Sequence, residues 1–161
     1  MDFEERLRQA VERGTKRGEQ QQEASKVRAL TEDELKRLHS QQRLEISDYI
    51  EACLKKLPLH FPGFQFETLF GDRGWGGACS RDDLRFQGGT RSSDYSRLEV
   101  AVRPYSPQTH VVELVAKGTV RNKEAFNRNY YEKLGEAETA RFCQLVDAWI
   151  LEFAEIFAAV K

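Results

Sequence analysis

The chain has 161 residues, of which 40% are hydrophobic and 32% charged, and 25 Lys and Arg against 26 Asp and Glu give a formal net charge of −1 at pH 7. A chain of this size buries enough surface to fold without disulfides or a structural metal, so we expect one sizeable core. The near-zero net charge argues against general binding of nucleic acid or anionic lipid.

The sequence has no stretch that predicts membrane insertion or export. No window approaches the roughly 18 continuous apolar residues of a membrane span. The acidic first five residues lack the basic and apolar regions of a signal peptide. We therefore predict a cytoplasmic protein with no membrane partner.

Cys53, Cys79 and Cys143 are an odd number of thiols at wide, irregular spacings. This pattern fits neither a disulfide framework nor a paired zinc motif, and the three histidines add no ligand-like spacing to it. We predict reduced thiols, of which Cys53 and Cys143 lie on apolar helix stripes. No metal and no cofactor is expected.

The first thirty residues differ in kind from the rest. Phe3, Leu7 and Val11 form a short helical stripe, which two glycines and three consecutive glutamines interrupt. So few large apolar groups cannot offset the ordering entropy of this segment alone. We predict that residues 1–30 are a flexible or helical arm that docks on a partner, and that residues 31–161 form a single domain.

A long amphipathic helix is predicted to begin at Thr31. Thr31 and Glu34 have the spacing of a capping box, in which the two side chains satisfy free amides of the first turn. Apolar residues then recur in steps of three and four from Leu35 to Leu57, and Pro58 ends the pattern.

From Pro62 the period of the apolar residues changes to two, which predicts four strands. Their apolar faces carry, in turn, Phe64, Phe66 and Phe70; Leu84 and Phe86; Leu98, Val100 and Val102; and Val112, Leu114 and Ala116. The connections are rich in turn residues, so the strands are expected to form an antiparallel meander. Charged residues on the opposite faces of the third and fourth strands predict that one sheet face is wet.

Two helices are predicted after Val120. Asn122 caps a short helix that contains Phe126 and Tyr130 and ends at Gly135. The second helix has a wide apolar stripe from residue 142 to residue 160 and is the strongest element of the chain.

The predicted order is therefore α-β-β-β-β-α-α. We predict an α+β two-layer sandwich, in which the N-terminal helix and the C-terminal helices pack on a four-stranded antiparallel meander sheet. The chain has no internal repeat and no alternation of strands and helices, which argues against a doubly wound nucleotide-binding fold.

The glycine-rich segment at residues 71–77 is the first candidate site. Its glycines permit close backbone approach, but their spacing matches neither a phosphate-binding loop nor a dinucleotide fingerprint. The sequence favours a plain hairpin connection followed by a strand that begins after Asp82. The alternative is a ligand-binding set in which Trp75 stacks on the ligand, Asp82 lies on the inward strand face and Arg85 neutralises an anionic group.

Charged residues of the predicted sheet suggest two other functions. Metal-dependent nucleases place acidic groups and a lysine on neighbouring strands, as Asp82 or Asp83, Glu99, Glu113 and Lys117 would be, but the Glu-x-Lys spacing is missing and cross-strand ion pairs explain these residues. Arginines near Trp75 and Tyr95 suit single-stranded nucleic acid, but acids in the same segment cancel their field. No context for a serine or cysteine nucleophile is found, so no catalytic residue is predicted.

A protein interface is the favoured candidate. In the predicted short helix two aromatics face inward and leave Asn127, Arg128 and Tyr131 on the surface, and Leu151 widens the stripe of the final helix. We predict a non-enzymatic interaction or assembly module that binds a protein partner or forms a homo-oligomer, with a dimer favoured. The alternatives are a small-ligand-binding protein or enzyme at the glycine-rich segment, and sheet-mediated nucleic-acid binding.

Overall fold

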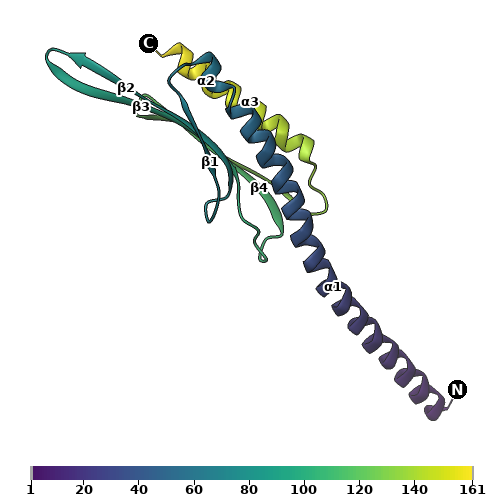
Figure 1. Cartoon of the computed structure of the whole chain (residues 1–161). Coiled ribbons are helices and arrows are strands. Elements are labelled where there is room, and N and C mark those ends of the chain that lie inside the picture. Colours follow the sequence, from purple (N-terminus) through teal and green to yellow (C-terminus); the bar gives the residue numbers. More distant parts are fainter. Residues whose placement is uncertain (1, 161) are drawn as a thin grey trace. The chain divides into compact units, whose positions relative to one another are not determined.

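The computed structural model describes residues 2–160, and for residues 24–31 it describes the backbone alone. The chain divides between Arg37 and Leu38 into two units. Figure 1 shows the elements, which in chain order are α1 (Phe3–Leu54), α2 (Leu57–His60), β1 (Gln65–Leu69), β2 (Trp75–Gln87), β3 (Thr90–Val102), β4 (Val111–Val120), β5 (Lys123–Lys133) and α3 (Thr139–Ala159).

The first unit is helical. The predicted helix start at Thr31 is wrong, because α1 begins at Phe3 and continues without a break to Leu54. Most residues of the first unit are Glu, Arg, Gln, Lys and Ala, which are strong helix formers. Gly14 and Gly18 each cost the helix only about 1 kcal/mol relative to Ala, so they do not end it.

The second unit contains one antiparallel sheet with the strand order β1-β2-β3-β4-β5. This order confirms the predicted meander. The predicted number of four strands is wrong, because a fifth strand, β5, follows β4.

The stretch that forms β5 was predicted to be a short helix. Phe126 and Tyr130 are four residues apart, a spacing that places two side chains on one face of either a helix or a strand. Arg121 and Asn122 have φ angles of 47° and 70°, and they form the tight turn between β4 and β5. Asn122 is therefore a turn residue and caps no helix, because two positive φ angles match the twist of a hairpin.

One face of the sheet is covered by helices. Figure 1 shows α3 and residues 38–54 of α1 on the same side of the strands. The predicted strong C-terminal helix is confirmed, and α3 contacts β3 and β4. Its buried side chains are Phe142, Val146, Trp149, Ile150, Phe153 and Phe157.

The strand register separates a helix-covered face from an open face. Leu98 and Val100 of β3 and Leu114 of β4 are fully buried on the covered face, as predicted. The prediction that Phe70, Leu84 and Phe86 also belong to the apolar faces is wrong, because their exposed fractions are 77%, 52% and 74%. Phe70 lies beyond the end of β1.

The β2–β3 hairpin explains the exposure of Leu84 and Phe86. β1 pairs with β2 only at residues 76–80, and β4 pairs with β3 only at residues 97–102. Residues 81–96 therefore form a two-stranded ribbon. Alternation does place Leu84 and Phe86 on one face, but it is the open face that also carries Ala78.

The burial of His39 predicts a pH-dependent stability for the second unit. Its side chain is 2% exposed, and its Nε2 atom has no hydrogen-bond partner among the described residues. Burial and the charge of Arg43 lower the pKa of His39 below its ordinary value of 6.5, against the opposing effect of a hydrogen bond to the Arg103 backbone.

We expect the free energy of unfolding to decrease as the pH falls below about 6.5, because the unfolded chain protonates His39 at a higher pH than the folded chain does. Chemical denaturation at a series of pH values measures this dependence. His39→Gln is expected to show a smaller decrease over the same range. An equal decrease in both proteins would assign the pH dependence to other groups.

Candidate functional site

The β1–β2 turn places Arg73 at the edge of the open sheet face. Gly71 and Gly74 have φ angles of 111° and 121°, which favour glycine, and the Gly74 amide donates to the Gly71 carbonyl at 3.1 Å. A Cβ atom on Gly74 would lie 2.3 Å from the carbonyl oxygen of Val102. These two glycines therefore fix a tight turn that presents Arg73.

Cross-strand pairing brings polar side chains of three strands together on the open face. Glu99 of β3 pairs with Lys117 of β4, and Lys117 pairs with Asn127 of β5. The neighbouring row contains Ala101, Val115 and Asn129 in the same order. The small side chains of this second row leave a hollow between the longer ones.

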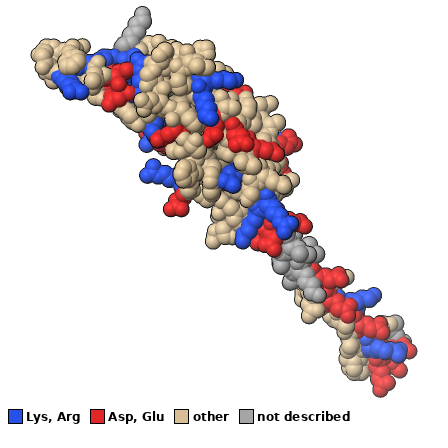
Figure 2. All heavy atoms as spheres, in the orientation of Figure 1, with Lys and Arg blue, Asp and Glu red and all other residues tan. Residues whose placement is uncertain are grey.

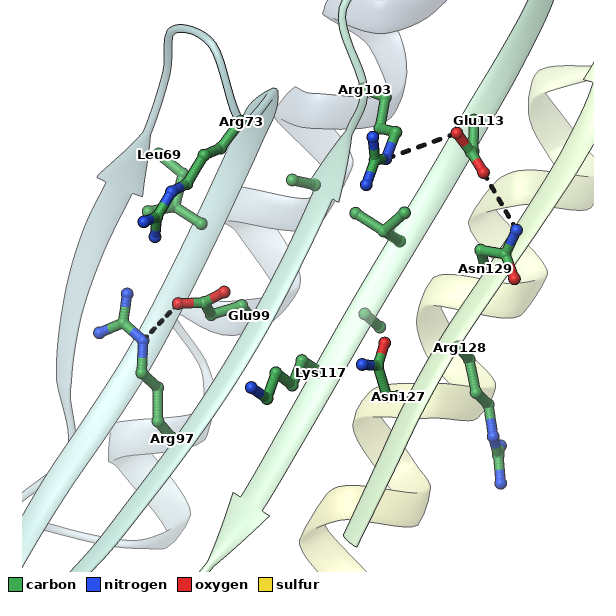
Figure 3. Close-up of a pocket in the computed structure, with 13 residues that line it drawn as sticks. Leu69, Arg73, Arg97, Glu99, Arg103, Glu113, Lys117, Asn127, Arg128 and Asn129 are labelled. Atoms are coloured by element: carbon green, nitrogen blue, oxygen red, sulfur yellow. Dashed lines mark hydrogen bonds and ion pairs between the residues drawn. The ribbon is translucent and has the colours of Figure 1, made fainter. Parts of the chain in front are cut away.

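We call this hollow the sheet groove (Figure 3). Its volume is about 350 Å³. It is lined by Leu69, Arg73, Arg97, Glu99, Ala101, Arg103, Glu113, Val115, Ala116, Lys117, Asn127, Arg128 and Asn129. The sheet groove lies on the face opposite the helices, since its β3 residues alternate with the buried Leu98 and Val100.

Carboxylates hold three of the five cations that line the sheet groove: Arg97, Arg103 and Arg128, which pairs with Glu152 of α3. The Nε atom of Arg97 lies 2.6 Å from Glu99, and its Nη2 atom lies 2.6 Å from Glu67. Burial alone would lower the pKa of Arg97, but these hydrogen bonds raise it above its ordinary value. Arg103 lies 3.5 Å from Glu113, which also accepts a hydrogen bond from Asn129 at 3.0 Å.

Two further cations have no such carboxylate. Among the described residues, neither Arg73 nor Lys117 has an ion pair or hydrogen bond, and both side chains are exposed. Lys117 is the cross-strand partner of Glu99, but the Glu99 carboxylate is bonded to Arg97. Figure 3 shows Arg73, Arg97 and Lys117 around Glu99.

The sheet groove continues toward Tyr95. A second hollow of about 260 Å³ shares Arg73, Arg97, Glu99 and Lys117 with the groove, and Tyr95 and Thr119 complete its lining. Tyr95 is 39% exposed. An aromatic ring therefore lines the same hollow as the two cations that lack a carboxylate partner.

The predicted ligand-binding residues Trp75, Asp82 and Arg85 are not brought together. Trp75 begins β2, and its ring lies under the guanidinium of Arg43, with 4.0 Å from Cζ to the ring centroid. Asp82 is seven residues further along the strand, or about 23 Å at the usual rise of a β-strand.

Asp82 and Arg85 also have partners of their own. Asp82 lies within β2, is exposed, and accepts a hydrogen bond from Ser93 on the open face. It is neither on the covered face nor ahead of the strand, because β2 begins at Trp75. Arg85 points to the other face, where its Nε atom lies 2.6 Å from Asp94.

The residues predicted for an interface are divided between two faces. Asn127 and Tyr131 lie on the open face of β5, and Tyr131 is 60% exposed. Arg128 makes a two-pronged ion pair with Glu152 of α3. Leu151 lies on α3 and is 64% exposed. A strand alternates its faces at every residue, so these neighbours cannot form the one helix surface that was predicted.

Leu151 lines a hollow in the helical layer. Tyr49 and Cys53 of α1 and Asp147 and Ala154 of α3 also contribute to this hollow, whose volume is about 530 Å³. The Tyr49 hydroxyl donates to Asp147 at 2.6 Å, and this hydrogen bond raises the pKa of Tyr49 above its ordinary value. The contact joins α1 directly to α3.

The three cysteines are free thiols. Burial raises the pKa of all three, and for Cys79 the pKa rises to about 11. The thiols are therefore protonated and weakly nucleophilic at neutral pH.

Within residues 2–160, no cluster of three or more His, Cys, Asp or Glu side chains has the geometry to hold a metal ion. No helix in this range is long and apolar enough to cross a membrane.

The sequence patterns indicated a wet sheet face but missed the sheet groove as a site. Alternation in β3 and β4 identified which residues share the open face. It did not reveal the register that sets Lys117 beside Asn127, nor the turn that adds Arg73.

Comparisons of the chain with protein families, with curated proteins and with solved structures find no match.

Proposed function

We propose that the protein is a self-associating module whose N-terminal helix supplies the contact between copies. The observation that carries this proposal is the exposure of Phe3, Leu7 and Val11, at 72%, 52% and 60%. We call these three residues the N-terminal stripe. They are spaced by four residues on a helix, so they lie on one side of α1.

The width of the N-terminal stripe suits a single partner helix. Three residues at steps of four cover about 80° of the helix circumference, which is a narrow seam rather than the wide face that covers a sheet. Gly14 and Gly18 continue the seam and permit close approach of a second backbone. Outside the stripe, residues 2–23 are mostly charged or amide side chains, and all of them are exposed.

A second copy of the chain is the partner that this helix fits. Residues 2–23 contain six acidic and five basic side chains, so two copies of the helix do not repel each other. Each copy also presents the same narrow apolar seam. Burial of a Phe, Leu or Val side chain stabilises a protein or complex by about 1.5–3 kcal/mol. A chain on its own leaves these three side chains exposed, so it gains this free energy only when a partner covers them.

The triple variant Phe3→Ser, Leu7→Ser, Val11→Ser is expected to weaken self-association by about 100-fold or more, because it removes the apolar contact of both copies. Analytical ultracentrifugation over a range of concentrations measures the dissociation constant. The matched control is Glu5→Ser, Glu12→Ser, Lys16→Ser, which changes three residues on the opposite side of the same helix. Equal weakening by both triple variants would contradict a contact through the stripe.

A second variant separates the contact from the stability of the helix. Gly14→Gln with Gly18→Gln raises helix propensity by about 0.5–1 kcal/mol per site, so the helical circular dichroism signal is expected to increase. Self-association is expected to weaken, because two larger polar side chains enter the seam. A monomeric wild-type chain at all concentrations would overturn the proposal and leave a different protein as the partner.

A further inference from the structure

We propose that the sheet groove binds a small organic oxyanion, a phosphate monoester or a carboxylate, with its anionic group between Arg73 and Lys117 and a planar group beside Tyr95. This site is separate from the N-terminal stripe and shares no residue with it. Failure of one proposal therefore leaves the other intact.

The pairing pattern of the charges identifies where the anion binds. Arg97 and Arg103 are already engaged by Glu99, Glu67 and Glu113. Arg73 and Lys117 line the same hollows and have no carboxylate partner in residues 2–160. Arg73 and Lys117 reach these hollows from a turn and a strand, and the nearby Glu99 is paired with Arg97, so the cations are in excess and favour an added anion.

Neutral groups complete the set of donors. Asn127 lies next to Lys117 in the cross-strand row, and its amide can donate hydrogen bonds to an oxyanion. Lysine and arginine together suit a group with several oxygen atoms, because lysine acts as a compact charge and arginine as a planar fork. The ion pair of Arg97 with Glu99 offsets the negative charge that would otherwise repel a bound anion.

The size of the hollows points to a small ligand. The sheet groove has about 350 Å³, near the lower end of the 300–1,000 Å³ typical of small-molecule sites. A nucleic-acid strand needs a longer track of cations. The lining of the sheet groove mixes its cations with Glu99 and Glu113, so they do not form such a track. Basic and acidic side chains are also interspersed on the side of the molecule that Figure 2 draws.

The test is an NMR titration of the full-length, ¹⁵N-labelled chain with two probes that share a ring, phenyl phosphate and benzoate. Benzyl alcohol is the uncharged control. We expect saturable shifts of the backbone amides of Glu99, Lys117 and Asn127 with at least one anion and none with benzyl alcohol. The tighter of the two anions distinguishes a phosphate ligand from a carboxylate ligand.

Paired variants test whether the two cations carry the binding. Arg73→Ala with Lys117→Ala is expected to weaken binding at least tenfold, and both residues are exposed, so the fold is retained. Arg91→Ala with Lys133→Ala removes the same charge from residues outside both hollows and is expected to leave binding unchanged. The proposal is overturned by equal losses in the two variants, by the absence of saturable shifts, or by far tighter binding of a single-stranded oligonucleotide.

Discussion

Phe153→Ala is expected to lower the free energy of unfolding by about 3–5 kcal/mol, the usual cost of removing a buried phenylalanine ring. Phe153 is fully buried on α3. Its ring centroid lies 6.1 Å from that of Phe64 and 6.3 Å from that of Phe157. The ring also packs over Gly118 of β4, where a Cβ atom would lie 3.2 Å from its edge.

Chemical denaturation measures this loss of unfolding free energy. Two controls distinguish the effect of removing a buried ring from the effect of the substitution itself. The first control is Leu151→Ala, because Leu151 is two residues away on the same helix but is 64% exposed. The second is Phe70→Ala, which makes the same chemical change at a side chain that is 77% exposed. Both are expected to change the unfolding free energy by less than about 0.5 kcal/mol. A loss below about 1 kcal/mol for Phe153→Ala would contradict the placement of α3 over the sheet.

Gly76→Ala is expected to cost about 3 kcal/mol or more, because the added methyl group meets backbone. A Cβ atom at Gly76 would lie 2.0 Å from the carbonyl oxygen of Val100 and 2.8 Å from the Cα atom of Ala101. Both contacts belong to β3, the neighbouring strand, which is paired on both sides and cannot move alone. The clash is therefore relieved only if β2 moves away from β3.

The matched control is Gly88→Ala in the β2–β3 turn. No atom lies within 4 Å of a Cβ there, but the φ angle is +57°, so the cost is conformational strain of about 1–2 kcal/mol. Denaturation midpoints of the two variants distinguish a steric clash from backbone strain. Equal midpoints would mean that β2 and β3 are further apart at Gly76 than the structure has them.

Apolar periodicity predicted the elements that bury one clear face. The C-terminal helix repeats its apolar residues over five turns, the burial of β4 alternates along the whole strand, and that of β3 alternates from Ser96 to Val100, so each pattern admits a single element type. The prediction from apolar spacing was wrong where the spacing fits both a helix and a strand. Phe126 and Tyr130 fit a helix and a strand equally well, and the turn at Arg121 and Asn122 was the overlooked signal that decides between them.

The candidate site was less predictable than the fold. Trp75, Asp82 and Arg85 are near one another in sequence, but an extended strand separates them and alternates their faces. Arg73 and Lys117 are 44 positions apart and meet only through the register of four strands and one glycine turn. Sequence proximity is therefore a poor guide to a site on a meander sheet, whereas cross-strand partners define it.

The meander connects strands that are neighbours in the sequence, and this order has a consequence for biosynthesis. Every strand of the sheet can pair as soon as the next one leaves the ribosome, because each connection is short and local contacts form rapidly. The contacts between the helices are of another kind, since Tyr49 of α1 donates a hydrogen bond to Asp147 of α3, 98 residues later. During synthesis the apolar side of the completed sheet therefore waits for α3, and a nascent chain that stalls before Thr139 is expected to be the most aggregation-prone intermediate.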